Sequence, residues 1–182
     1  DDAAGLAISE KLKGELTGLE QAQLNVQDTV SLLQTAEGGM VTIHNMLNRM
    51  VELTTKAANG VYDTSVDRAA IKSEIDALKD EINRISRSIN FNNKTLLDGS
   101  FNNVQFQIGS EESDAVVVTI AALDAAALGL DAIDVSSPEK ATESLKVVKE
   151  AINKVSTERA NVGVTQNRLE YTLNNITETY SN

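Results

Sequence analysis

The side chains that could do chemistry in this chain are few and widely spaced. His44 is the only histidine, and there is no cysteine. A catalytic or metal-binding histidine needs partners at a defined spacing, yet no Glu-x-x-His, His-Glu-x-x-His, Gly-x-Gly-x-x-Gly or P-loop sequence occurs. We therefore expect no enzyme activity, no cofactor and no metal site. His44 itself is expected to be a partly exposed residue beside the apolar face of a helix.

The charged residues also indicate a solvated surface rather than a reactive site. Glu10 with Lys13 and Asp80 with Arg84 stand three or four residues apart, which is typical of exposed helix faces. The net charge of -11 and the pI of about 4.5 argue against nucleic acid as a partner and against an anionic membrane surface. No apolar run reaches the length of a membrane span, and no signal peptide is visible.

The elements that carry these residues are predicted by apolar spacing. Aromatic residues make up only 3% of the chain and there is no Trp, so the core must consist of thin aliphatic seams between helices. A first helix is expected over residues 3–59, ending at Asn59-Gly60. Gly38-Gly39 inside it could mark a bend or a close approach of another segment. Its apolar positions are Ile8, Leu12, Leu16, Leu19, Ala22, Val26, Val30, Leu33, Ala36, Met40, Ile43, Leu47, Met50 and Ala57.

Two further helices show the same spacing. The second starts after Thr64 or Ser65, and the third opens at residues 136–139 with a capping box of Ser136 and Glu139 and with Pro138 in the first turn. The second seam is Ile71, Ile75, Leu78, Ile82, Ile85 and Ile89. The third runs through Ala141, Leu145, Val148, Ile152, Val155, Arg159, Val162, Gln166, Leu169, Leu173, Ile176 and Tyr180, and its two polar members can fix helix register.

The segment between the second and third helices differs in character. Residues 104–108 and 116–120 alternate apolar with polar positions, which predicts a β-hairpin with a loose polar loop. Asp98-Gly99 is a turn signal, and residues 121–127 are expected to form a short helical turn ending at Gly129. The predicted fold is mainly α: an elongated antiparallel bundle of three long helices with a small β-hairpin. We expect one domain over 1–182, divided into helices (1–90), hairpin and connections (91–135) and a last helix (136–182).

Several short stretches, taken together and in order, resemble bacterial flagellin. They are Asp1–Ile8, Ser31–Gly38, Leu47–Leu53, Ala57–Gly60, Glu81–Ile85, Phe91–Gly99, Phe106–Gly109, Ala127–Leu130 and Gln166–Glu170. The resemblance implies the core domain of a flagellar filament subunit, with other flagellin subunits as partners and an extracellular location on the bacterial flagellum. It also implies that the family's two terminal helices are missing, so that this chain is a core fragment that stays monomeric and does not polymerise. A hook–filament junction protein of the same superfamily is the alternative, and a cytosolic helical adaptor is a third hypothesis.

The same resemblance implies a second role, recognition by Toll-like receptor 5. The family's receptor-binding pattern lies on the first helix and on an acidic residue of the second. In this sequence it falls on Leu47, Arg49, Glu52, Leu53 and Glu74. Asn48 and Val51 depart from that pattern, which has Gln and a second Arg there. Asn93 stands where the family usually has Gly in a turn, and Asn tolerates the left-handed backbone that such a turn requires.

Overall fold

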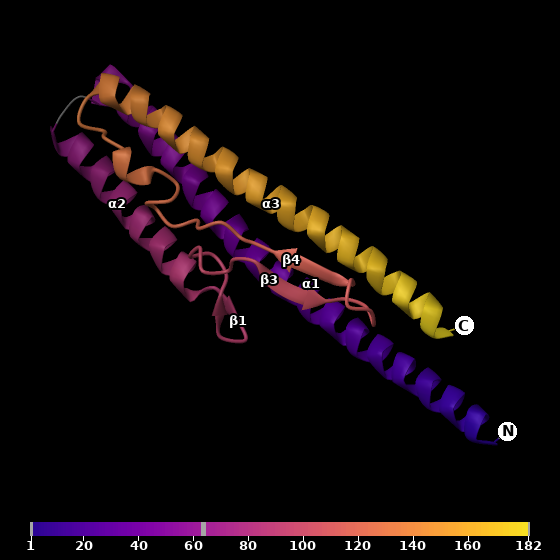
Figure 1. Ribbon diagram of the computed structural model, residues 1–182. Helices are drawn as coiled ribbons and strands as arrows, with labels where there is room; N and C mark the ends of the chain where they lie inside the picture. The colour runs from indigo at the N-terminus through magenta and orange to yellow at the C-terminus, as the bar shows by residue number, and fades with distance from the viewer. Residues whose placement is uncertain (1, 63–64, 182) are drawn as a thin grey trace. The chain divides into compact units, whose positions relative to one another are not determined.

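The computed structural model describes residues 2–62 and 65–181, and its helices match the predicted ones closely. Asp1 and Thr64 lie outside these residues, as does the side chain of Tyr180. Three long helices and two small hairpins confirm a mainly α fold (Figure 1). The elements are α1 Asp2–Ala57, η1 Gly60–Tyr62, α2 Ser65–Ser88, β1 Asn90–Phe91, β2 Lys94–Thr95, β3 Val104–Gln107, β4 Ala115–Val118, η2 Leu130–Ala132 and α3 Pro138–Ser181.

The chain divides into two compact units, and α1 and α3 contribute to both. Unit 1 contains the described parts of 1–34, 103–119 and 162–182. Unit 2 contains 35–102 and 120–161. The single domain over 1–182 stays a prediction.

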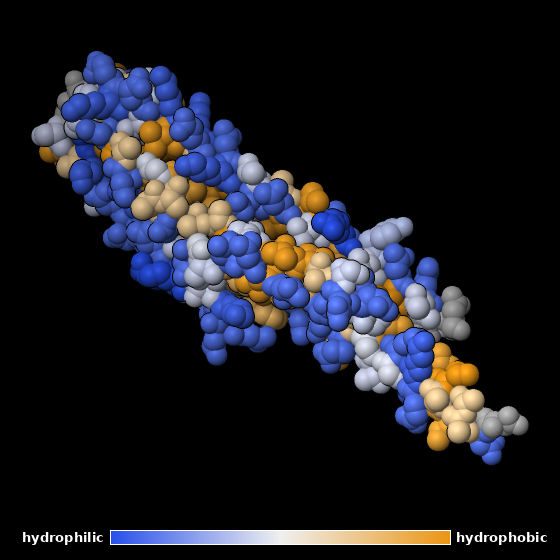
Figure 2. Space-filling view, in the orientation of Figure 1, coloured by the Kyte–Doolittle hydropathy of each residue, from blue (hydrophilic) through white to orange (hydrophobic). Residues whose placement is uncertain are grey.

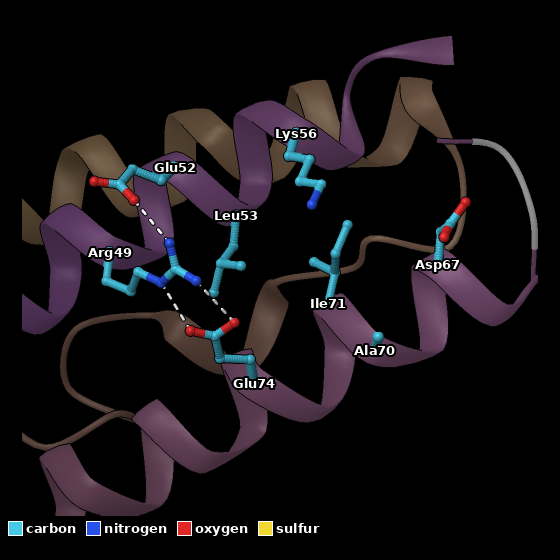
Figure 3. A pocket seen from close by; sticks show the side chains of 8 residues that line it. All are labelled: Arg49, Glu52, Leu53, Lys56, Asp67, Ala70, Ile71 and Glu74. Carbon is cyan, nitrogen blue, oxygen red and sulfur yellow. Dashed lines mark hydrogen bonds and ion pairs between the residues drawn. The ribbon is translucent and has the colours of Figure 1, made fainter. Parts of the chain in front are cut away.

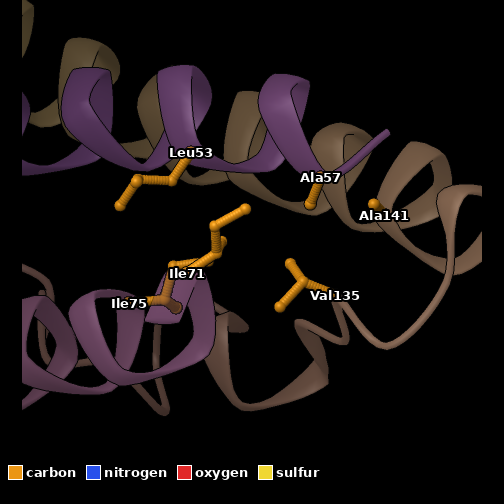
Figure 4. Close-up of a cluster of buried hydrophobic side chains, with 6 residues drawn as sticks. All are labelled: Leu53, Ala57, Ile71, Ile75, Val135 and Ala141. Carbon is orange, nitrogen blue, oxygen red and sulfur yellow. The ribbon is translucent and has the colours of Figure 1, made fainter. Parts of the chain in front are cut away.

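In unit 2, the helices pack through the aliphatic seams that the spacing predicted. Ala57 of α1 shares a buried cluster with Ala141 of α3, while Glu37 of α1 bonds Arg159 of α3. Residue numbers therefore rise along α1 as they fall along α3, so the two segments are antiparallel. Figure 4 shows this cluster where α1, α2 and the chain before α3 converge. Its members are Leu53, Ala57, Ile71, Ile75, Val135 and Ala141.

Arg68 ties the same end of unit 2 together through backbone carbonyl groups. Its Nη1 donates to the carbonyl oxygens of Ala57 (2.8 Å) and Val135 (2.9 Å), and only 7% of the residue is exposed. The last carbonyl groups of a helix have no N–H donor within that helix. A guanidinium from α2 thus satisfies the end of α1 and fixes the segment that leads into α3.

In unit 1, the β3–β4 hairpin rests on α1. The alternation predicted this hairpin, and the structure pairs Val104 with Val118 and Phe106 with Val116. Asn25 Nδ2 on α1 donates to the carbonyl oxygen of Gln107 at 2.9 Å, which attaches the hairpin to the helix.

The predicted seam of α1 is wrong in its first part. Ile8, Leu12 and Leu16 are 62%, 53% and 44% exposed, and continuous burial begins only at Ala22. The spacing correctly identifies the apolar side of the helix. Among the described residues, however, the hairpin and α3 cover that side only from about Ala22 onward.

The predicted capping box of α3 is also wrong by one residue. Ser137, not Ser136, caps the helix: its Oγ accepts from the backbone N–H of Lys140 at 3.2 Å, and its carbonyl accepts from Ala141. Ser136 instead donates its N–H to Asp134 Oδ1. Pro138 is the first helical residue, the place where its fixed φ and missing N–H cost least, and this sets the cap at the residue before it.

Turns in the middle segment combine confirmed and unexpected features. Asn92 and Asn93 have positive φ (50° and 64°), so Asn93 does adopt the left-handed backbone expected of it. These two residues connect β1 to β2, a two-residue pairing that the sequence did not predict. Gly99 (φ 89°) confirms the turn at Asp98-Gly99. The helical turn expected over 121–127 begins at Asp124, where Leu128 N–H bonds its carbonyl, and ends at Gly129 in the left-handed region.

Gly38 and Gly39 of α1 have different surroundings. Replacing each with Ala should therefore change the stability of the chain in opposite directions. A Cβ on Gly39 would lie 2.8 Å from Leu97 Cδ1 and 3.0 Å from Ile89 Cγ1, whereas a Cβ on Gly38 would meet nothing within 4 Å. We expect Gly38→Ala to stabilise the chain by about 0.5–1 kcal/mol through helix propensity. Gly39→Ala should destabilise it by about 1 kcal/mol or more, because overpacking costs about 1–3 kcal/mol.

Urea unfolding followed by circular dichroism would measure both variants, each serving as the control for the other. Equal stabilisation by the two substitutions would contradict the close approach of Leu97 and Ile89 to Gly39.

Candidate functional site

Three of the five residues singled out by the sequence, Arg49, Glu52 and Glu74, form a group of ion pairs between α1 and α2, which we call the fork. Arg49 Nε donates to Glu74 Oε1 at 2.7 Å, and Nη2 donates to Glu74 Oε2 at 3.1 Å. Nη1 donates to Glu52 Oε2 at 2.8 Å. Figure 3 shows the guanidinium held between the two carboxylates. Every donor nitrogen of Arg49 therefore has a carboxylate partner, and the contact with Glu74 is bidentate.

Helix geometry and the core below place these three side chains. Arg49 and Glu52 lie one turn apart on α1, so their side chains meet on one face. Glu74 lies one turn from Ile71, which packs with Leu53 of α1 in the buried cluster. The aliphatic contact between Leu53 and Ile71 holds α1 and α2 at a fixed distance, and the fork spans that distance at the surface.

Beside the fork lies an open cleft of about 340 Å³. Leu53, which is 4% exposed, and Ile71, which is 5% exposed, form its apolar floor (Figure 3). Charged side chains surround that floor. The lining residues are Arg49, Glu52, Leu53, Lys56, Asp67, Ala70, Ile71 and Glu74.

The electrostatics of the fork follow from these contacts. The side-chain hydrogen bond to Glu74, followed by the one to Glu52, raises the pKa of Arg49 further above its ordinary value. Arg49 therefore keeps its charge at every physiological pH. The side chains of Arg49, Glu52 and Glu74 are 48%, 68% and 42% exposed, so solvent screens the pairs and a partner could reach all three. Two carboxylates against one guanidinium leave one formal negative charge in excess.

The structure separates the five predicted residues into two groups. Arg49, Glu52 and Glu74 lie together at the surface. Leu47 is fully buried in the core, and Leu53 reaches only the floor of the cleft. The resemblance placed both leucines in the receptor-binding pattern, and the apolar spacing also placed Leu47 in the seam of the first helix. The helix turns both side chains inward.

Three further cleft residues were not singled out from the sequence. Lys56 follows Glu52 at i+4 on α1, while Asp67 and Ala70 precede Glu74 at i−7 and i−4 on α2. That spacing puts each set on one helix edge. The signal was present, but only the pairing of α1 with α2 shows that the two edges face each other.

His44 lies in a separate polar contact between α1 and α3. Its Nδ1 is 3.3 Å from Arg159 Nη1, and Arg159 Nε donates to Glu37 Oε1 at 3.0 Å. His44 is half-buried, as expected for a residue beside the seam. The described residues contain no cluster of three or more His, Cys, Asp or Glu side chains able to hold a metal ion. None of the helices described is long and apolar enough to cross a membrane.

Comparison with known families gives two matches that together cover most of the chain. The bacterial flagellin N-terminal helical region matches residues 1–102, and the bacterial flagellin C-terminal helical region matches residues 145–182.

Relatives are similar in sequence to this chain along nearly its whole length. A flagellin from Bacillus subtilis is 41% identical over 100% of this chain and 71% of its own length. A flagellin from Halalkalibacterium halodurans is 39% identical over 97% of the chain and 65% of its own length. A flagellar filament core protein from Brachyspira hyodysenteriae is 39% identical over 100% and 69%. The chain thus spans about two thirds of the length of these relatives.

Solved structures distinguish the family from its wider fold. The crystal structure of Bacillus cereus flagellin is 32% identical and superposes with a TM-score of 0.74, covering 84% of this chain and 88% of that one. A protein described as flagellar hook-associated from Vibrio parahaemolyticus superposes with a TM-score of 0.81 over 98% and 93% of the two chains, but at 16% identity it shares the fold alone. With both flagellin regions matched and about 40% identity to named flagellins along its full length, the chain belongs to the bacterial flagellin family.

Proposed function

We propose that this chain acts as a structural subunit of the bacterial flagellar filament and not as an enzyme. The observation that carries the proposal is the full-length identity to flagellins and to a flagellar filament core protein. The molecule's chemistry agrees with a structural role, because aliphatic seams fill the space between helices and exposed charged groups such as Arg49 and Arg84 form ion pairs.

Exposed apolar side chains on α1 support contacts with other subunits. Ile8, Leu12 and Leu16 continue the line of the buried residues Ala22 and Val26, yet each is at least 44% exposed. Figure 2 shows apolar surface over the N-terminal part of α1. A contiguous apolar strip at a surface typically marks an interaction site. In a filament, packing against neighbouring flagellin chains would remove it from water.

Immunogold labelling would test the filament role and separate it from the alternatives. Antibodies raised against this chain should label flagella along their whole length in the bacterium that produces it. Label confined to the junction of hook and filament would favour the junction protein, and label confined to the cell interior would favour a cytosolic adaptor. Antibody absorbed with the purified chain is the control.

By itself, the 182-residue chain is proposed to remain monomeric. Each copy carries a net charge of -11, so copies repel one another, and the exposed strip on α1 is only one helix wide. Sedimentation velocity at low protein concentration should give a single monomeric species. Long polymers under the same conditions would show that this chain polymerises unaided.

We further propose that Toll-like receptor 5 recognises the fork of Arg49, Glu52 and Glu74. The support is the flagellin pattern that these residues carry, together with their convergence on one exposed surface beside a cleft. An Arg held by flanking carboxylates is fixed in one orientation, and such pre-organised residues are frequent interface hot spots. In this arrangement the guanidinium face, the carboxylate oxygens and the cleft are presented together.

Replacing Arg49 should weaken binding to the receptor ectodomain. We expect Arg49→Ala to reduce affinity roughly 30-fold or more, the typical effect of losing a hot-spot residue. Glu74→Gln should cause a smaller loss, because Arg49 remains but one side of its clamp is neutral. Surface plasmon resonance on the purified chain would measure both affinities.

Arg84→Ala is the matched control for Arg49→Ala. Arg84 is also an exposed guanidinium on a helix, paired with Glu81 at i−3, but it lies outside the cleft. Thermal unfolding would confirm that all variants are folded. Equal affinity of Arg49→Ala and Arg84→Ala for the receptor would remove the fork from the binding surface.

A further inference from the structure

The connection between α1 and α2 contains a dipeptide whose two residues can react with each other. Asn59-Gly60 is the only Asn-Gly dipeptide in the chain. In such a pair the backbone nitrogen of Gly can attack the carboxamide carbon of Asn, closing a five-membered succinimide and releasing ammonia. Gly favours this step because it has no side chain to shield its nitrogen and moves easily between backbone conformations.

The structure leaves room for this reaction. α1 ends at Ala57, and Asn59 and Gly60 are both exposed. A Cβ built on Gly60 would meet no heavy atom within 4 Å, so no other segment crowds the Cα of this residue. Gly60 is the first residue of η1, and the first N–H groups of a helix have no acceptor within that helix.

The hydrogen bonding of Asn59 favours the same step. The backbone N–H of Val61 donates to Asn59 Oδ1 at 3.2 Å, which directs the carboxamide oxygen toward the backbone that follows Asn59. Attack on the carboxamide carbon places negative charge on Oδ1. A backbone donor already directed at that oxygen stabilises the charge as it develops, as an oxyanion hole does.

Two asparagines within helices lack this combination. Asn48 is exposed but lies within α1, where the backbone nitrogen that follows it belongs to a continuous helix. Asn83 lies in α2, and its Oδ1 accepts from the backbone N–H of Ala125 in a distant segment, which holds the carboxamide away from its own chain.

We propose that Asn59 is a site of intramolecular deamidation, with the backbone nitrogen of Gly60 as the nucleophile. The bond from Gly60 N to Asn59 Cγ forms as the bond from Cγ to the amide nitrogen breaks, and ammonia leaves. Water then opens the succinimide at either carbonyl, giving aspartate or isoaspartate at position 59. No oxidant, metal or enzyme is required.

The products would alter the end of α1 in two ways. Either one places a negative charge next to the helix C-terminus, where the helix dipole is already negative. Isoaspartate also lengthens the backbone by one carbon between Ala57, whose carbonyl is held by Arg68, and Val61. The aspartate form can keep the bond from Val61, whereas the isoaspartate form displaces it.

Timed incubation of the purified 182-residue chain at 37 °C would test the proposal. Peptide mapping by mass spectrometry should show conversion of the amide at Asn59, with faster loss at pH 8.5 than at pH 7 because the nucleophile is the deprotonated backbone amide. An isoaspartyl methyltransferase assay should detect the isoaspartate product. Asn48, in the same samples, should keep its amide and serves as the internal control.

Two comparisons make the outcome decisive. Gly60→Ala, which has open space for its methyl group, should fold normally and lose the Asn59 amide several-fold more slowly. Folded chain should convert Asn59 at least as fast as chain unfolded in urea at the same pH. Retention of the amide in folded protein while the unfolded control loses it would overturn the proposal, as would an unchanged rate in Gly60→Ala.

Discussion

Packing of small aliphatic side chains along one face of α1 is the constraint on which the rest of this structure depends. In unit 2, α2 and α3 both bury their own seams against that face, through residues such as Leu53, Ile71 and Ala141. In unit 1, the hairpin bonds to α1 at Asn25, and the buried positions of α1 begin at Ala22. The core has few aromatic rings, so its close contacts come from many small groups fitting between helices. Interiors of this kind leave little space for a buried reaction site, and the Arg49 fork accordingly lies at the surface.

The Arg49 fork shows how the surface depends on that packing. Exposed ion pairs contribute little to folding, because solvent screens them and ordering long side chains costs entropy. The separation of α1 and α2 is instead set by the aliphatic contact of Leu53 with Ile71 beneath. The fork is therefore a product of the fold rather than its cause. This permits the fork residues to be replaced with less risk to folding than Leu47 or Leu53, so effects on binding at the fork can be separated from loss of structure.

Sequence periodicity predicted the three helices and the main hairpin because each carries regularly spaced apolar residues on one face. It could not show whether a partner segment covers that face, and for this reason Ile8, Leu12 and Leu16 were wrongly placed in the core. The pairing of β1 with β2 escaped notice because two-residue strands are too short to alternate. The cap of α3 shifted by one residue because two serines stand side by side and Pro138 selects between them.

The candidate site, like the fold, was predictable only where residues on one helix determine it. Arg49 and Glu52 follow from spacing on one helix, whereas contact with Glu74 requires the antiparallel pairing of α1 and α2 in the correct register. Leu47 and Leu53 match the linear pattern but belong to the core, because neighbours in a sequence pattern point in different directions on a helix. A linear motif identifies residues; the helix phase decides which of them a partner can touch.

Register between α1 and α3 has a separate source, since aliphatic seams of uniform spacing permit sliding by a heptad. Arg159 interrupts the seam of α3 and reaches Glu37 and His44 on α1. Shifting α3 by two turns would leave the half-buried guanidinium without these acceptors, and a polar group removed from water without partners is costly. A polar residue at a seam position thus selects one alignment among several that aliphatic packing alone would allow. That alignment brings Ala57 beside Ala141 and sets where the chain before α3 meets Arg68, so one polar contact determines how the far end of unit 2 closes.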